Sequence, residues 1–315
     1  MSTATSIQPP TTTVMTTTTP TLQIQTVLYK ADRASVDRLF TSVARAAELA
    51  TAAEAVGTVG LAVGDCSPLP VLRTSGVPEL AVALAQAGVG MFHYEFFDRN
   101  LGSAAGHNRL LSTWDTDLVL VLNPDVVASP YLLQELILRL DDPKIGIVEG
   151  RQLPLEHPKA YDPVTGETSW ASTACALVPR RVFHEVGDFD SSSFFLYCDD
   201  VDFSWRVRLA GYKILFHPPA RVFHDKRIDA LGQMQVGPAE EYYAAEAALM
   251  MVHKWSRPDL VRKYLAGLLA NGSPRERDAA EAFARRRRSG DLPQPLDPSH
   301  EVGEFYGFNW ARHRW

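Results

Sequence analysis

Short apolar runs alternate with segments of helical period through the first half of the chain. Four runs are rich in apolar and β-branched residues, as buried strands are, and they cover residues 21–29, 58–63, 89–92 and 118–122. Between them, apolar side chains recur at helical spacing in residues 35–56 and 78–87. This order predicts an α/β fold in which a mostly parallel sheet is covered by helices on both faces. Such sheets bind ligands beyond the carboxyl ends of their strands.

The second half of the chain predicts shorter elements and then a helical end. The elements expected are helices at 180–186 and 200–210, extended pieces at 213–216 and 220–223, and helices at 238–254, 259–269 and 274–288. Residues 1–20 are rich in Thr and Pro and have too few apolar side chains to fold, so we expect a disordered tail. The chain therefore divides into this tail, an α/β domain at 21–230 and a helical C-terminal extension at 231–315.

Composition excludes several classes of protein. The 315 residues carry 31 basic and 37 acidic side chains, whereas a dedicated nucleic-acid binder would carry a basic surplus. Cys66, Cys175 and Cys198 lack C-x-x-C spacing, which favours small buried residues in a reducing compartment. The most apolar window, residues 118–133, is interrupted by polar residues, and a membrane span needs about 18 apolar residues in a row. Since no leader pattern opens the chain, we expect a cytoplasmic protein.

The first group of candidate functional residues is Asn123-Pro124-Asp125, directly after the apolar run 118–122. A carboxylate at the end of a strand can reach a divalent cation whose other ligands are nucleotide phosphates. The same three residues also suit an ordinary turn. His224 follows another extended piece and would complete a metal site with Asp125, although a histidine there is also a common structural residue.

The second group is Asp199, Asp200 and Asp202, which follow the apolar residues 194–196. Carboxylates so close together repel one another unless a cation, a proton or a helix N-terminus takes up the charge. Apolar neighbours would raise the pKa of one of them toward neutral pH, as a general base requires. The alternative is that Asp199 and Asp200 only cap the helix that follows.

Two other segments each allow a structural and a functional interpretation. Residues 99–108 contain Gly102 and Gly106 and read as a tight loop that opens a helix; their small residues would let a ligand approach the backbone. The run Arg285–Arg288 ends a helix, where cations are favourable, and would equally attract an anionic membrane surface.

The order of these motifs carries more information than any one of them. Asp65, Asn100-Leu101-Gly102 with Asn108, the run LVLVLNPD, the stretch 186–214 and His224 occur in the order found in one family. The chain resembles the inverting family 2 glycosyltransferases of the GT-A fold, a Rossmann-like fold that binds nucleotide-sugars. Bacterial rhamnosyltransferases and galactofuranosyltransferases of cell-envelope glycan synthesis are the most similar members. The resemblance covers residues 22–225.

The resemblance implies metal-dependent transfer of a sugar, of the rhamnose or galactofuranose type, from a UDP- or dTDP-sugar to a glycan or lipid-linked glycan acceptor. It implies Asp200 as the general base with Asp199 beside it, and a Mn²⁺ or Mg²⁺ ion at Asp125 and His224. The residues it implies in donor binding are Tyr29, Asp65, Asn100, Gly102, Asn108, Asn123 and Asp125. Those it implies in acceptor contact or structural support are Trp170, Asp202 and Arg206.

The sequence also departs from the family pattern. Asn123 stands where the family's metal motif has a carboxylate, and Asp199-Asp200 replaces the usual Glu-Asp. Asn123 favours the alternative of a catalytically inactive GT-A domain that binds glycans or serves as a scaffold. A nucleotidyl- or phosphotransferase is a weaker alternative, because no basic phosphate clamp lies near the acidic segment. Peripheral contact with a membrane and assembly into a homo-oligomer both stay open.

Overall fold

The structure is a computed structural model that describes residues 19–156, 159–226, 237–307 and 309–310. Its strands are β1 (Leu22–Leu28), β2 (Val59–Asp65), β3 (Met91–Phe96), β4 (Leu118–Leu122), β5 (Val126–Ala128), β6 (Ile145–Leu153), β7 (Glu167–Thr168), β8 (Cys175–Pro179) and β9 (Lys213–His224). Its α-helices are α1 (Arg33–Ala52), α2 (Val77–Gln86), α3 (Gly102–Leu111), α4 (Leu132–Ile137), α5 (Arg180–Val186), α6 (Asp199–Leu209), α7 (Pro238–Lys254), α8 (Pro258–Asn271) and α9 (Pro274–Ser289).

One large sheet has the strand order β3-β2-β1-β4-β8-β6-β9-β5, and β7 pairs with β9. The four strands from β3 to β4 are parallel, β8 runs antiparallel to both of its neighbours, and β6 and β9 are again parallel. Parallel pairs join most of the paired residues. The predicted α/β fold with a mostly parallel sheet and a helical C-terminus is therefore confirmed.

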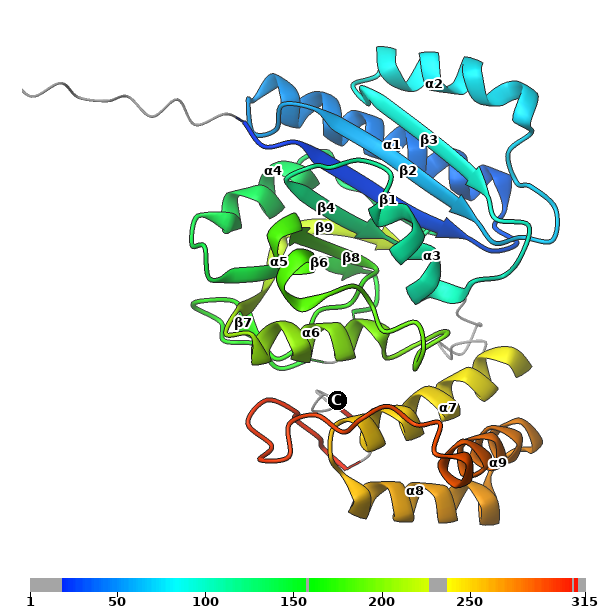
Figure 1. Cartoon of the computed structure of the whole chain (residues 1–315). Helices are drawn as coiled ribbons and strands as arrows, with labels where there is room; N and C mark the ends of the chain where they lie inside the picture. Colours follow the sequence, from blue (N-terminus) through cyan, green and yellow to red (C-terminus); the bar gives the residue numbers. More distant parts are fainter. Residues whose placement is uncertain (1–18, 157–158, 227–236, 308, 311–315) are drawn as a thin grey trace, which may run out of the picture.

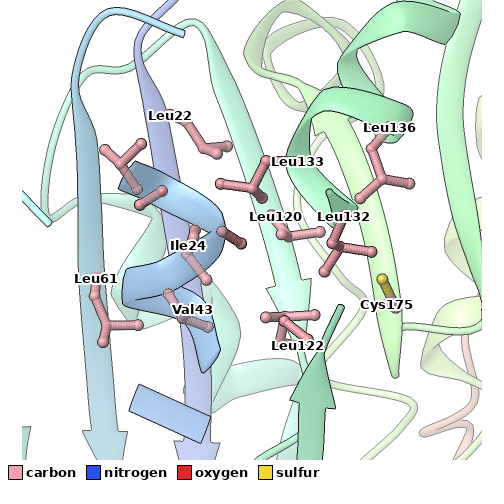
Figure 2. Packing of buried hydrophobic residues seen from close by; sticks show 14 of the residues in the cluster. Leu22, Ile24, Val43, Leu61, Leu120, Leu122, Leu132, Leu133, Leu136 and Cys175 are labelled. Atoms are coloured by element: carbon pink, nitrogen blue, oxygen red, sulfur yellow. The ribbon is translucent and has the colours of Figure 1, made fainter. Parts of the chain in front are cut away.

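Helices cover both faces of this sheet, as the alternation of side chains along each strand requires. In β4, Leu120 and Leu122 face the cluster beneath α1 and α4, whereas Val119 and Val121 face the cluster beneath α3, α5 and α6. Figure 2 shows the first of these clusters, in which leucines of β1 and β4 point toward the leucines of α4. The sheet is thus buried on both sides, and its strand ends are free to form a site.

The C-terminal helices α7, α8 and α9 pack on one another around Met250 and Phe283, in a core that they share with Val201 and Trp205 of α6. Figure 1 shows this bundle on the α6 side of the sheet. The Trp255 ring meets Trp205 of α6 edge to face, with 5.0 Å between the ring centroids. The expected tail at 1–20 lies almost wholly outside the described residues, as does the expected boundary between residues 230 and 231.

The two extended pieces expected at 213–216 and 220–223 are joined in the structure. Residues 213–224 form a single strand across Pro218–Pro219 rather than two separate pieces. The register with β6 jumps from the pair Gly150–His217 to the pair Arg151–Arg221, so the prolines lie in an irregularity of the ladder. A proline has no N–H to donate, and such a position does not require one.

Candidate active site

A cleft of about 370 Å³ opens where the strand ends meet the starts of α3, α6 and α7. It is lined by Ser103, Asn123, Asp125, Trp170, Ser172, Thr173, Ala174, Leu196, Tyr197, Cys198, Asp199, Asp200, His224, Lys226, Glu240 and Trp310. The cleft unites the predicted metal residues, the predicted base and Trp170, which lie up to a hundred residues apart in the sequence. This is the best candidate for an active site among the described residues.

Asp125 and His224 meet because β4 and β9 reach the same edge of the sheet. The imidazole Nε2 of His224 lies 3.2 Å from Oδ1 of Asp125 and 3.4 Å from Nδ2 of Asn123. On the other side of the ring, Nδ1 lies 2.8 Å from the carboxamide Oε1 of Gln152, which can only accept a hydrogen bond. A hydrogen bond between these two atoms requires the proton on Nδ1, and in that tautomer of the neutral ring Nε2 keeps its lone pair for a metal ion.

This pair fits a divalent cation. A neutral imidazole nitrogen and a carboxylate oxygen at 3.2 Å are both acceptors, so they repel each other unless a proton or a cation lies between them. A carboxylate oxygen suits Mn²⁺ and Mg²⁺ alike, and a neutral imidazole nitrogen is a common ligand of metal ions in proteins. In the part of the chain that the structure describes, no three His, Cys, Asp or Glu side chains are placed so that together they could hold a metal ion. An ion at this site would therefore complete its coordination with substrate phosphates and water, as Mg²⁺ commonly does.

Asp199 and Asp200 occupy the first turn of α6. The chain enters this helix through Tyr197 and Cys198, both with positive φ, which turns the backbone sharply before the two carboxylates. Burial raises the pKa of Asp199 and of Asp200, and the charge of Asp199 raises that of Asp200 further. The Oδ2 atom of Asp199 is buried without a hydrogen-bond partner. The segment thus does more than cap a helix: it places two proton-accepting groups in the cleft.

The predicted donor residues Asp65 and Tyr29 do not line the cleft. Asp65, at the end of β2, is fully buried, and its carboxylate accepts hydrogen bonds from the backbone N–H groups of Ser67 and Val71 and from the Tyr94 hydroxyl, at 2.7–2.9 Å. Asp65 therefore fixes the loop that follows β2. Tyr29, after β1, is half exposed and free to contact a ligand. Their predicted contact with a nucleotide stays a prediction.

Asn100, Gly102 and Asn108 fix the start of α3 against the segment before α6. The side chain of Asn100 accepts a hydrogen bond from the N–H of Gly102 at 3.1 Å. Gly102 has φ +75°, and a Cβ there would lie 2.2 Å from the backbone oxygen of Phe195. Asn108 donates to the carbonyl of Phe189 and accepts from its N–H, at 2.7 and 3.0 Å. None of the three lines the cleft, although Ser103 beside Gly102 does, and their contact with the donor stays a prediction.

Asp202 and Arg206 point away from the cleft and have a structural role. Asp202 is fully buried and accepts hydrogen bonds from Arg206 at 2.9 Å and from the Trp255 indole at 3.1 Å. Its other ion-pair partner is Lys254, the last residue of α7, at 2.8 Å. Of the two predicted roles, acceptor contact or structural support, the geometry favours support for Asp202: it joins α6 to the C-terminal helices.

The sequence reasoning missed two lysines in or near the cleft. Lys226 lines the cleft near Asp125 and supplies a cation there. Lys159 does not line the cleft, but it lies 4.2 Å from the ring centroid of Trp170, which does, and it pairs with the buried Glu149. No motif marks either lysine, because only the folded chain makes these contacts.

Comparison with known proteins identifies the family of one segment of the chain. Residues 73–202 match the family described as Glycosyl transferase family 2. This range includes Asp125, Asp199 and Asp200 and ends at Asp202. The chain carries a glycosyltransferase family 2 domain. The resemblance inferred from the motifs is confirmed.

Two relatives of the domain come from Mycobacterium tuberculosis. An N-acetylglucosaminyl-diphospho-decaprenol L-rhamnosyltransferase is 38% identical over 65 residues, which are 21% of this chain and 21% of that protein. A pre-mycofactocin glycosyltransferase is 30% identical over 145 residues, which are 40% of this chain and 30% of that protein. The matched segments therefore span less than a third of these relatives.

Two solved structures share the fold of the glycosyltransferase domain. The mannosyltransferase PcManGT from Pyrobaculum calidifontis, in complex with GDP-Man and Mn²⁺, has a TM-score of 0.50 at 15% identity, over 87% of this chain and 84% of that one. GalNAc-T7 with UDP, GalNAc and Mn²⁺ has a TM-score of 0.61 at 14% identity, over 90% and 57%. In the described part of this chain, no helix combines the length and the apolar character that a membrane crossing needs.

Proposed function

We propose that the chain is a metal-dependent, inverting glycosyltransferase that moves a sugar from a nucleoside-diphosphate sugar to a hydroxyl group of a glycan or glycolipid. The observation that carries this proposal is the composition of the cleft. Asp200, a carboxylate with a raised pKa, shares the cleft with Asp125 and His224, whose facing oxygen and nitrogen atoms suit a metal ion. Asp125 and Asp200 lie within the family 2 segment 73–202, and His224 lies beyond it. The match to a rhamnosyltransferase supports a donor of the rhamnose type and a role in cell-envelope glycans, while the pair Asp199-Asp200, which resembles galactofuranosyltransferases, keeps a donor of the galactofuranose type as the alternative.

Asp200 is suited to act as the base. Inversion needs one displacement, in which the acceptor oxygen bonds to the anomeric carbon as the bond to the diphosphate breaks on the opposite face. The proton of the acceptor hydroxyl passes to a carboxylate oxygen of Asp200, whose raised pKa makes it a better proton acceptor than an ordinary aspartate. The carboxylate of Asp199 lies beside Asp200, and its negative charge raises the pKa of Asp200 further.

Asp125 and His224 would hold a Mn²⁺ or Mg²⁺ ion, with Gln152 orienting the imidazole. Such an ion, when bound, neutralises charge on the leaving diphosphate. Lys226 adds a cation on the same side of the cleft. The amide of Asn123 contacts His224 and leaves the carboxylate of Asp125 for the metal. The inactive-scaffold alternative rests on Asn123 alone, and the retained Asp125, Asp200 and His224 argue against it.

The first experiment is a thermal-shift panel of UDP, dTDP, GDP and CMP, each with Mn²⁺, with Mg²⁺ and with EDTA. A nucleotide present at a hundredfold excess over its Kd stabilises the folded state by about 2.7 kcal/mol. We expect one diphosphate nucleotide to raise the melting temperature with metal and not with EDTA. No shift with any nucleotide would favour the inactive scaffold.

The second experiment separates the loss of the general base from a loss of nucleotide binding. Asp200→Asn should lower transfer by about 10²- to 10⁴-fold, the usual contribution of a positioned base, and leave nucleotide binding intact. Asp188→Asn, which alters an exposed carboxylate outside the cleft, is the matched control and should keep full activity. Unchanged transfer by Asp200→Asn would refute the assignment of the base.

A further inference from the structure

A second hollow, of about 290 Å³, adjoins the candidate active site, and Trp310 lines both. Its walls come from the segment after β6, from α6 and from the C-terminal segment. Three aromatic side chains, Tyr161, Tyr306 and Trp310, contribute to the lining, and all three are partly exposed. The two spaces therefore meet at one indole ring.

The C-terminal segment that forms one wall is anchored on α6. Phe305 packs edge to face on Trp205, with 5.1 Å between ring centroids. Glu304 pairs with Arg208 at 3.0 Å, and Arg208 also donates to the carbonyl of Val302 at 3.0 Å. Residues 304 and 306 line the hollow while residue 305 packs into the core, so the alternation along the chain sends Tyr306 to the solvent side.

A tight turn then carries Trp310 to the rim. Tyr306 and Asn309 exchange two backbone hydrogen bonds, at 2.6 and 3.3 Å, and Gly307 between them has φ +67°. This anchoring means that the two aromatic rings are positioned before a ligand arrives, which lowers the entropy cost of binding.

The chemistry of the lining selects a class of ligand. Aromatic faces bind the C–H faces of sugars, and carboxylates accept hydrogen bonds from sugar hydroxyls. The hollow offers Asp162, Glu167 and Glu304 as acceptors, and Arg208 beside them. Arg208 pairs with Glu304 and Lys213 with Glu167, so the three carboxylates outnumber the cations by one. This surplus of negative charge disfavours a phosphate group, so a nucleotide does not suit this space. A neutral, hydroxyl-rich ligand does.

We propose that this hollow is an acceptor subsite, which binds a sugar unit of the acceptor glycan next to the unit whose hydroxyl reaches Asp200. The inference deepens the proposed function and rests on it, because only a transferase has an acceptor substrate. Trp310, at the junction of the two spaces, is the residue that would contact both sugar units.

Binding to an array of bacterial surface oligosaccharides tests the subsite without catalysis. We expect the full chain to bind at least one glycan, and Trp310→Ala to bind it at least tenfold more weakly. Trp310→Phe keeps an aromatic face and should lose less glycan affinity than Trp310→Ala. If Trp310→Ala bound weakly because it folds poorly, its melting temperature would also be lower. Tyr131→Ala, which removes an exposed aromatic ring outside both hollows, is the matched control. Binding to no glycan, or equal binding by Trp310→Ala, would overturn the proposal.

Two further arms separate this inference from the proposed function. Asp200→Asn should keep glycan binding while it loses transfer. Glycan binding that depends on Trp310, together with no response to any nucleotide, would support the subsite and refute the transferase. Nucleotide-dependent transfer whose KM for a glycan acceptor is the same in Trp310→Ala would support the transferase and refute the subsite.

Discussion

Lys254 lies between two carboxylates, and its replacement by methionine tests whether these ion pairs hold the C-terminal helices on the α/β domain. The ammonium group is 2.7 Å from Asp190 and 2.8 Å from Asp202, and the lysine side chain is only 6% exposed. Removing one partner of a buried pair costs about 3–5 kcal/mol, because the other charge is left without compensation. Here Asp202 keeps Arg206, and Asp190 keeps the N–H groups of the serines that follow it, so we expect about 3 kcal/mol.

Urea unfolding followed by tryptophan fluorescence measures this loss, since Trp255 lies beside Asp202 and reports on the same contact. With an m-value of about 3 kcal/mol per molar, the midpoint of Lys254→Met should fall by about 1 M. Lys254→Arg keeps the charge and should recover most of the loss. Arg275→Met breaks the exposed pair with Asp278 and is the control, with an expected change of about 0–1 kcal/mol.

The pH dependence gives a second readout. Burial alone would raise the pKa of Asp190, but Lys254 and the hydrogen bonds from Ser192 and Ser193 lower it well below its usual range. A depressed folded-state pKa stabilises the fold above the unfolded pKa of about 3.9 and loses that effect only as the pH falls below it. The deficit of Lys254→Met should therefore be equal at pH 5 and pH 8. A loss below 1 kcal/mol at both would refute the reasoning.

Three other outcomes follow from the site. Gly102→Ala places a Cβ against a backbone oxygen at positive φ and should cost about 2–4 kcal/mol in thermal unfolding, whereas Gly267→Ala, in open space within α8, should gain about 0.5–1 kcal/mol; equal effects would contradict this. Gln152→Leu should raise the Mn²⁺ concentration for half-maximal transfer by about 10–100-fold, measured by metal titration, and an unchanged value would exclude its orienting role. Transfer should fall as the pH drops through the raised pKa of Asp200, and Asp199→Asn should move the midpoint of the pH–rate profile to lower pH; an unmoved midpoint would exclude the coupling.

Local patterns predicted most of the elements. The run 118–122 is β4 to the residue, and the helices expected at 180–186 and 238–254 have the predicted bounds. The elements that were not predicted are α4 and the strands β5, β6, β7 and β8. Both β6 and β8 lie in the middle of the sheet, where pairing with neighbours rather than local alternation decides the conformation, and β5 and β7 have only three and two residues. The α4 helix has six residues, too few for a clear helical period.

The sequence by itself determined the α/β class, the family and the types of residue in the cleft, because strand and helix periods and the order of motifs are local properties of the chain. Only the tertiary structure decided what each residue does. It paired His224 with Asp125 and Gln152, and turned Asp202 toward the C-terminal helices. It also brought Trp310 to the cleft. Burial, pKa and hydrogen-bond partners depend on contacts between residues far apart in the sequence, and only the folded chain makes those contacts.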